Sequence, residues 1–169
     1  MTDDQMPQTI TIREAGPDEI ETVLQHRRFM FRDMGEGTTE QLDRMVEVAR
    51  PWLEKAMGGG FYRHWLAIDD GGRAAGGGGV LLSPWPANPH DPCVERAIIL
   101  NVYTELEFRR RGVARQVMDV ILAWLKARGL RSVNLHASNE GRPLYEALGF
   151  EPTNEMRLWL DESKARAQS

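Results

Sequence analysis

The chain has 169 residues, a net charge of −4 at neutral pH, 41% hydrophobic residues and 27% charged residues. This length suits one folded domain with its own core, so we expect a single domain over residues 1–169 with its core at about 9–160. The negative net charge argues against a general nucleic-acid-coating role, which depends on neutralising phosphates with lysine and arginine.

The sequence also favours a cytoplasmic protein without a membrane partner. Cys93 is the only cysteine, so no intrachain disulfide can form, which agrees with a reducing compartment. The first residues, MTDDQMPQ, lack the apolar core of a signal peptide. The apolar run Ala97–Leu100 is far too short to cross a bilayer.

The N-terminal third predicts a strand and two helices. Thr9–Glu14 alternates β-branched and polar residues, which is typical of a strand. Gly16–Gly35 predicts a helix, because Pro17 and the acidic residues after it suit a first helical turn. Thr38–Gly60 predicts a second helix, which we expect Pro51 to kink or divide.

A hairpin and a loop follow. His64–Ile68 and Gly78–Leu82 read as strands joined by a turn at Asp70–Gly72. Four consecutive glycines, Gly76–Gly79, are unusual in a strand and indicate a bulge or a close backbone approach, with a flexible hairpin shoulder as the alternative. Ser83–Pro92 contains four prolines and predicts a loop.

The second half alternates strands and helices. Val94–Thr104 is the strongest strand candidate, and a helix with a clear apolar face runs from Val113 to Gly129. Arg131–Ala137 predicts a further strand, Gly141–Leu148 a short helix, and Glu155–Leu160 a last strand. Together these elements predict one mixed α/β domain.

The turn before the Val113 helix concentrates positive charge. Arg109–Arg111 directly precede Gly112, between the strongest strand and the clearest helix. A helix N-terminus exposes unpaired N–H groups and the positive end of the helix dipole, so it accepts phosphate readily. Gly112 and Ala114 keep bulky side chains away from that backbone. The turn is thus a candidate anion site; a solvated turn and a nucleic-acid patch are the alternatives, the latter disfavoured by the net charge.

Two motifs resemble the signatures of one enzyme family. The stretch RRRGVA, with Arg109, Gly112 and Ala114 in the key places, resembles the Arg/Gln-x-x-Gly-x-Gly/Ala signature of the GCN5-related N-acetyltransferases (GNAT). Further on, Ser138–Glu151 (SNEGRPLYEALGFE) resembles the second signature of that family. The resemblance implies an α/β fold whose central, splayed and mostly antiparallel sheet is flanked by helices.

The resemblance implies acetyl-CoA as the acyl-donor cosubstrate. The strand end would bind the pantetheine arm, the turn would bind the pyrophosphate, and one of two later polar residues would add a contact. The cofactor-binding residues implied are Asn101, Val102, Tyr103, Thr104, Arg109, Arg110, Arg111, Gly112, Val113, Ala114, Arg115, Ser138 and Asn139. The chain departs from the family pattern at Leu106, where many relatives have proline, and at Ser138, where many have asparagine.

The implied activity is direct attack of an amine on the thioester. Tyr145 in LYEALGF matches the general acid of the family, and packing in the core is the other interpretation of this tyrosine. Glu95, at the start of the predicted strand Val94–Thr104, is the first candidate for the base that removes the amine proton. The other base candidates are a water relay or one of Glu105, His136, Asp33 and Glu36.

The implied acceptor is a primary amine of a small molecule or a peptide, and the sequence does not identify it. Tyr103 and Trp85 are candidates for the wall of the acceptor pocket, with plain packing as the alternative. We expect no metal site, because His26, His64 and His90 show no metal-ligand spacing. A homodimer is left open, since similar proteins are often dimers. The alternative function is a catalytically silent acyl-CoA-binding regulatory module.

Overall fold

The structure, a computed structural model, describes residues 9–160, and the chain divides into two compact units between His136 and Ala137. The single domain expected over residues 1–169 stays a prediction. The strands are β1 (Thr11–Glu14), β2 (Tyr62–Ile68), β3 (Ala74–Pro84), β4 (Glu95–Thr104) and β5 (Val133–Leu135). The helices are α1 (Ile20–Asp33), α2 (Thr39–Gly58), α3 (Val113–Ala127) and α4 (Arg142–Ala147), with 3₁₀ turns at Pro17–Glu19 and Leu106–Phe108.

The five strands form one sheet in chain order, and the mixed sheet expected from the sequence is confirmed. The first four strands pair antiparallel, and β5 pairs parallel to β4. The β2–β3 hairpin turns at Asp70–Gly72, as the sequence predicts; the Oδ1 of Asp69 accepts from the N–H groups of Gly71 and Arg73 and fixes this turn.

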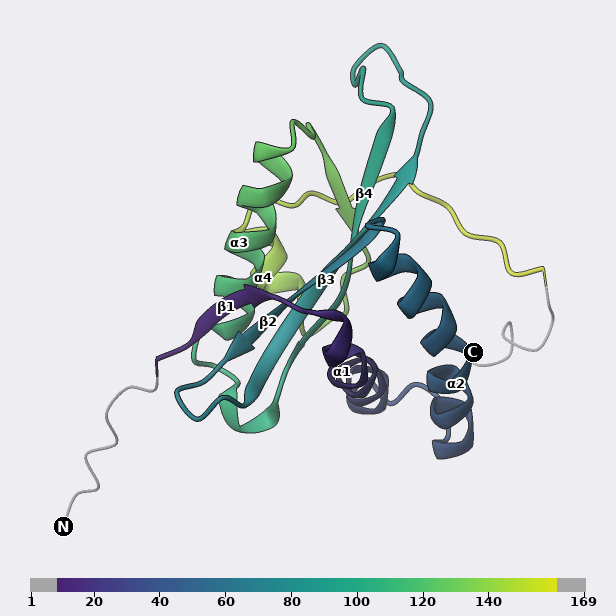
Figure 1. The fold of residues 1–169 in the computed structure, drawn as a ribbon. Helices are drawn as coiled ribbons and strands as arrows, with labels where there is room; N and C mark the ends of the chain where they lie inside the picture. The colour runs from purple at the N-terminus through teal and green to yellow at the C-terminus, as the bar shows by residue number, and fades with distance from the viewer. Residues whose placement is uncertain (1–8, 161–169) are drawn as a thin grey trace. The chain divides into compact units, whose positions relative to one another are not determined.

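The two faces of the sheet carry different helices. In Figure 1, α3 covers one face, and α1 and α2 lie on the other. The helices bury their apolar stripes against the sheet, and each fully buried aliphatic side chain contributes roughly 1.5–3 kcal/mol. The core toward α1 and α2 contains Ala15, Val23, Leu24, Leu53, Ala56, Tyr62 and Leu66. The buried side chains of α3 are Val113, Val117, Met118, Ile121 and Leu125.

The run of four glycines makes room for two buried side chains of the neighbouring strand. A Cβ atom at Gly79 would lie 2.1 Å from the hydroxyl oxygen of Tyr62 and 2.9 Å from His64 Nδ1. A Cβ atom at Gly77 would lie 2.7 Å from His64 Nε2. The sequence interpretation of a close approach is therefore confirmed, and the alternative of a flexible shoulder is wrong.

Helix α2 is longer than its proline suggested. Thr38 caps its start, with the N–H of Gln41 donating to Thr38 Oγ1 over 3.3 Å, and the helix runs through Pro51 without interruption. The prediction that Pro51 divides the helix is wrong. Pro51 and Glu47, whose carbonyl loses its hydrogen bond, are both exposed, so water can satisfy that carbonyl.

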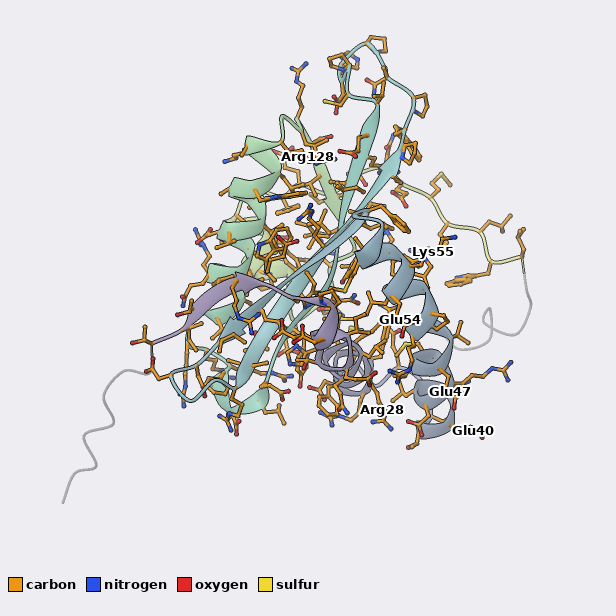
Figure 2. The ribbon with its side chains drawn as sticks, viewed as in Figure 1. Arg28, Glu40, Glu47, Glu54, Lys55 and Arg128 are labelled. Atoms are coloured by element: carbon orange, nitrogen blue, oxygen red, sulfur yellow. The ribbon has the colours of Figure 1, made fainter. Side chains whose placement is uncertain are left out.

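Charged side chains cover the outer side of α2. Glu40, Glu47 and Glu54 recur every seven residues along the exposed side of the helix (Figure 2). Such a stripe is typical of an amphipathic helix with one solvated face. Among residues 9–160, no helix has both the length and the apolar composition that crossing a membrane requires.

The expected last strand is absent. Residues 155–160 form no strand, which contradicts the sequence prediction for Glu155–Leu160. The alternating pattern is strand-like, but a strand needs a neighbour for its N–H and C=O groups, and no described strand pairs with this segment. Its apolar side chains are accordingly exposed, with Met156 at 95% and Leu158 at 81%.

Candidate active site

The C-terminal half of β4 has a neighbour on one side only. Strand β5 pairs with β4 over Ala97–Ile99 and ends there. From Leu100 to Thr104, β4 pairs with β3, and no described strand lies along its other edge. The backbone groups of Asn101–Tyr103 on that edge are available to a ligand, because unpaired N–H and C=O groups require a partner. This is the splay that the fold prediction called for.

A β-bulge lies at the start of this free edge. Gly77 pairs with Tyr103 and Gly79 pairs with Leu100, so β4 has one residue more than β3 at this point. Asn101 lies in the bulge and has a φ of 57°, a left-handed conformation that asparagine tolerates better than most residues. Its side chain is buried on the face of α1, where the bulge redirects it.

The turn after β4 presents the N-terminus of α3. Helix α3 begins at Val113, directly after Gly112, which has a φ of 75° and gives no side-chain cap. Arg110 is also left-handed, with a φ of 61°. The N–H groups of the first helical turn have no intrahelical acceptor, and the helix dipole adds positive potential there. The turn therefore fits the phosphate groups that the sequence assigned to it.

The arginines of the turn have different surroundings. Arg109 points back toward the fold: its Nε donates to the carbonyl oxygen of Thr104 over 3.0 Å, and its guanidinium pairs with Asp33 of α1. Arg110 and Arg111 are exposed. Arg115 lies 3.6 Å from Asp119, one helical turn further. The first arginine thus fixes the turn to α1, while the exposed ones add positive charge around the helix end.

The carboxylates proposed as bases are largely engaged. Hydrogen bonds from Arg128 to Glu95, at 2.8 and 3.1 Å, lower the pKa of that carboxyl and make it a weaker base. Burial alone would raise the pKa of Asp33, but its hydrogen bonds with Arg32 and Arg109 lower it. The catalytic role of Glu95 stays a prediction.

Glu105, a further base candidate, follows the free edge of β4. It accepts a long hydrogen bond from the hydroxyl of Tyr103 (3.4 Å) and lies 3.5 Å from His26 Nε2. Burial lowers the pKa of His26 to about 4, so this histidine is neutral at physiological pH. The two remaining base candidates, Glu36 and His136, are exposed.

The second unit carries the tyrosine predicted as general acid. Tyr145 lies on α4, and its ring packs edge-on against Phe150 with centroids 5.9 Å apart. Burial raises the pKa of the Tyr145 phenol, so it holds its proton at neutral pH. Ser138 Oγ accepts from the N–H of Gly141 over 3.1 Å, while Asn139 is exposed.

A cavity of about 450 Å³ lies between α1, α2, β3 and β4. Its wall is mostly apolar, and its two polar members are Arg27 of α1 and Asn101 of the bulge. The apolar members are Val23, Leu24, Met45, Val48, Ala49, Trp52, Leu53, Leu81 and Leu100. The cavity therefore reaches the strand at the start of the free edge. Tyr103 and Trp85, the expected wall residues, are not part of this lining.

A chain of hydrogen bonds connects the cavity to the glycine run. Arg27 donates to Asn101 Oδ1 over 2.5 Å, and Asn101 Nδ2 donates to the hydroxyl of Tyr62 over 2.7 Å. The Tyr62 hydroxyl also lies 3.1 Å from His64 Nδ1. Burial raises the pKa of Tyr62 to about 12 and lowers that of His64 to about 3. The network under Arg27 is therefore neutral.

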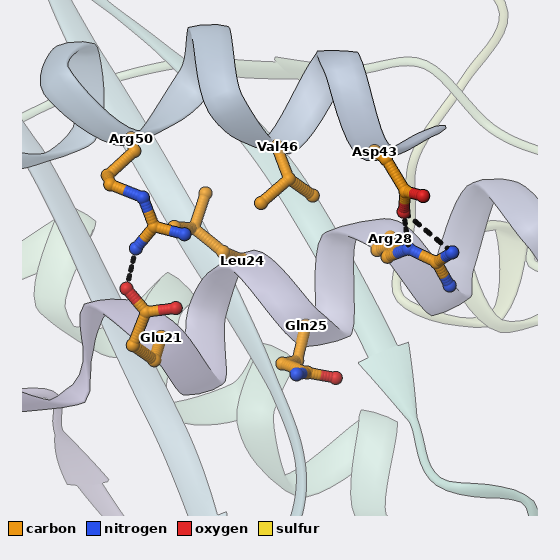
Figure 3. Close-up of a pocket in the computed structure, with 7 residues that line it drawn as sticks. All are labelled: Glu21, Leu24, Gln25, Arg28, Asp43, Val46 and Arg50. Atoms are coloured by element: carbon orange, nitrogen blue, oxygen red, sulfur yellow. Dashed lines mark hydrogen bonds and ion pairs between the residues drawn. The ribbon is translucent and has the colours of Figure 1, made fainter. Parts of the chain in front are cut away.

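A second, smaller hollow lies between the outer sides of α1 and α2 (Figure 3). Two ion pairs join the helices across it: Arg50 with Glu21, and Arg28 with Asp43 at 2.8 Å. Each cation has a carboxylate, so this hollow needs no further ligand. Among residues 9–160, no three histidine, cysteine or acidic side chains come together as a metal site would require.

Comparison with known proteins identifies the family. Residues 60–152, more than half of the chain, match the family model of an acetyltransferase (GNAT) domain. The chain belongs to the GCN5-related N-acetyltransferases. Membership in this GNAT family implies acetyl transfer from acetyl-CoA, and the matched region includes the free edge of β4, the Arg109–Arg115 turn and Tyr145.

Solved structures support the same assignment. A GCN5-related N-acetyltransferase from Ralstonia eutropha is 33% identical, with a TM-score of 0.84 over 90% of this chain and 99% of that one. A predicted acetyltransferase from Clostridium acetobutylicum, solved with acetyl-CoA, is 21% identical (TM-score 0.80; 89% and 96% covered). An acetyltransferase from Pyrococcus furiosus, described as putative, is 17% identical (TM-score 0.71; 89% and 99% covered). Among curated proteins, none matches the sequence significantly.

The GNAT domain thus brings part of the predicted site together. Asn101–Thr104 and Arg109–Arg115 lie on consecutive segments, the free edge of β4 and the start of α3. Tyr145, Ser138 and Asn139 lie in the second unit. Arg27, Tyr62 and His64 are not among the site residues predicted from the sequence. The glycine run, which indicated a bulge or a close backbone approach, is the one sequence signal for Tyr62 and His64, and Arg27 has none.

Proposed function

We propose that this protein transfers the acetyl group of acetyl-CoA to a primary amine of a small molecule or peptide, with Tyr145 as general acid. One observation carries the proposal: an unpaired strand edge runs directly into a turn that presents an uncapped helix N-terminus. The edge offers backbone hydrogen bonds to an extended chain, and the helix end offers N–H groups to phosphates. Coenzyme A has both parts.

The residues of this chain divide the binding work. The backbone of Asn101–Thr104 would bind the pantetheine arm, and the turn Arg109–Arg115 would bind the pyrophosphate chiefly through backbone N–H groups, with Ser138 or Asn139 adding a contact. Acetyl-CoA supplies an activated acetyl thioester. One N–H group of the β4 edge would donate to the thioester carbonyl oxygen and stabilise the negative charge that develops there.

Proton transfer completes the proposal. The attacking amine must lose a proton, and the departing sulfur must gain one. The raised pKa of Tyr145 keeps the phenol protonated and able to donate, which supports its role as the acid. Ion pairs with arginine make Asp33 and Glu95 weaker bases, which favours a water relay for the removal of the amine proton, with Glu95 as the alternative base.

The test measures coenzyme A release with a panel of amino acids, polyamines, aminoglycosides and peptides. The wild type should release coenzyme A only when a suitable amine is present. Tyr145→Phe should lower kcat by about 100-fold or more, because a general acid contributes at least that much, while acetyl-CoA still raises Tm. Gly112→Val is the binding control, and it should abolish that rise in Tm.

Two results would contradict the proposal. An unchanged kcat in Tyr145→Phe would remove this tyrosine from the reaction. A rise in Tm with acetyl-CoA, but no release with any amine, would identify a catalytically silent acyl-CoA-binding module instead.

A further inference from the structure

Arg27 is a half-buried cation, and no carboxylate of residues 9–160 forms a hydrogen bond or ion pair with it. Within residues 9–160, its polar partner is the side-chain oxygen of Asn101, and its guanidinium stacks over the ring of Phe31 at 5.0 Å from the ring centroid. Burial lowers the pKa of Arg27, and the one titratable group that opposes this effect is Tyr62, whose phenol is neutral. The charge is therefore desolvated without an opposite charge to compensate it.

The other arginines of α1, and Arg50 of α2, have the carboxylate that Arg27 lacks. Arg28 pairs with Asp43, Arg32 with Asp33, and Arg50 with Glu21. Each of these three lies on α1 or α2, as Arg27 does, and each has its own carboxylate. Because a buried unpaired charge is unfavourable, the environment of Arg27 points to an anion that residues 9–160 do not supply.

The position of Arg27 limits where that anion binds. The guanidinium contacts the side chain of Asn101, and Asn101 is the bulge residue at which the free edge of β4 begins. Tyr62 holds the Asn101 amide from the other side, so its oxygen faces Arg27. An anion bound by Arg27 therefore lies beside the strand segment to which the proposed function assigns the thioester.

The cavity defines the rest of the ligand. Its volume of about 450 Å³ falls within the usual range of small-molecule pockets. Beyond Arg27 and Asn101, the wall is aliphatic and aromatic, with side chains such as Leu24, Leu53 and Trp52. Such a wall favours an apolar group of substantial size and disfavours a charged one.

We propose that the acceptor is an α-amino acid with a large apolar side chain, a deepening that rests on the acetyl transfer proposed above. Arg27 binds the carboxylate, the cavity holds the side chain, and the α-amine faces the bulge at Asn101. An N–C bond forms as the thioester C–S bond breaks. The amine proton leaves to water, the thiolate takes the proton of Tyr145, and water returns a proton to Tyr145, which gives an N-acetyl amino acid and coenzyme A.

The test compares matched acceptors on the wild type by coenzyme A release. L-leucine and 3-methylbutylamine differ only by the carboxylate, and L-leucine and L-glutamate differ in the polarity of the side chain. We expect kcat/KM for L-leucine to exceed that for 3-methylbutylamine by about 10- to 100-fold, the usual worth of a hydrogen bond to a charged group. L-glutamate should be a poor acceptor.

The matched variants are Arg27→Gln and Arg28→Gln, which remove adjacent arginines from opposite sides of α1. Arg27→Gln should abolish the preference for L-leucine, so that L-leucine and 3-methylbutylamine give similar kcat/KM values. Arg28→Gln should keep the preference, because this arginine pairs with Asp43 outside the cavity. Arg27→Lys keeps the charge and serves if the glutamine variant does not fold; it should retain part of the preference.

The outcomes separate this inference from the proposed function. Equal kcat/KM for the two amines, or a preference that survives in Arg27→Gln, overturns the inference while acetyl transfer stands. If no amine releases coenzyme A, the proposed function fails, and calorimetric titration with L-leucine decides the inference alone. Binding that Arg27→Gln abolishes supports it, and an absence of binding overturns it.

Discussion

The two sides of α1 differ in whether their charged side chains have partners of opposite charge. On the outer side, Glu21 and Arg28 form ion pairs with α2, and every charge in the hollow of Figure 3 has a partner. On the inner side, Arg27 lies at the wall of an apolar cavity with a neutral amide as its polar partner. Charges that pair within the fold are already compensated, whereas a desolvated charge without a partner indicates a ligand.

The inner side of α1 also contacts a tightly packed part of the sheet. Tyr62 and His64 lie against the glycine run, and their hydrogen bonds reach Asn101 and then Arg27. The outer ion pairs have no comparable support from the sheet. Perturbations of the inner network should therefore affect stability strongly, and perturbations of the outer pairs should affect it weakly.

The largest effect on stability should come from lowering the pH, because acid protonates the two buried histidines, His26 and His64. Burial lowers the pKa of His64 to about 3 and that of His26 to about 4, below the unfolded value near 6.5. The unfolded chain therefore binds more protons between pH 6.5 and 4, so this contribution to stability is complete above pH 6.5 and is lost as the pH falls. Each histidine should lower the free energy of unfolding by about 2 kcal/mol from pH 7 to pH 5.

Urea unfolding at several pH values between 7 and 5 measures this slope. Carboxyl groups with lowered pKa values, such as Glu19 and Glu95, titrate below this pH range, so they contribute little to the slope between pH 7 and pH 5. His64→Gln should reduce the slope to about half, because His26 remains. A free energy of unfolding that does not change from pH 7 to pH 5 would show that the inner network is not held neutral.

The next largest effect is expected from Gly79→Ala. The new Cβ would lie 2.1 Å from the hydroxyl of Tyr62, which is fully buried and cannot move away without breaking its hydrogen bond with Asn101. Overpacking and the lost hydrogen bond together should lower the free energy of unfolding by about 3 kcal/mol. Chemical denaturation of the variant checks this value.

Gly78→Ala is the matched control for that variant. Its Cβ would lie 3.1 Å from a methyl group of Val117, on the face of the sheet that α3 covers. A few tenths of an ångström relieve this contact, so the free energy of unfolding should change by about 1 kcal/mol or less. If both variants lost the same free energy of unfolding, the glycine run would not be needed specifically to make room for Tyr62 and His64.

The smallest effect should follow from breaking an outer ion pair. Arg28→Gln removes the pair with Asp43, whose side chain is 58% exposed. Exposed pairs contribute about 0–1 kcal/mol, so Tm should change by a few degrees at most. A large loss of stability would show that the outer pairs, not the inner network, hold α1 in place.

Local sequence patterns predicted most of the fold and the turn Arg109–Arg115 before α3. Strand alternation, helix caps and the Asp70–Gly72 turn act over a few residues, so single segments show them. Gly112 is an example: its small size between a predicted strand and a predicted helix indicated an open turn at the point where α3 begins. The family resemblance added the roles that local chemistry does not specify.

Long-range contacts explain what the sequence did not show. Arg27 and Asn101 are far apart in the chain, and only the sheet and α1 bring them together. The bulge that turns Asn101 inward depends on the pairing of β3 with β4. The errors share this origin. Pro51 is tolerated because its side of α2 is exposed, and Glu155–Leu160 forms no strand because it lacks a described partner.

The most direct test observes the two adjacent arginines in one sample. The ¹H–¹⁵N signals of the Arg27 and Arg28 side chains would be followed by NMR during titration with L-leucine in the presence of coenzyme A, and assigned with the two glutamine variants. L-leucine should shift the Arg27 Nε–H signal and leave that of Arg28 unchanged, whereas 3-methylbutylamine should shift neither strongly. An unmoved Arg27 signal, or a shift confined to Arg28, would contradict the account.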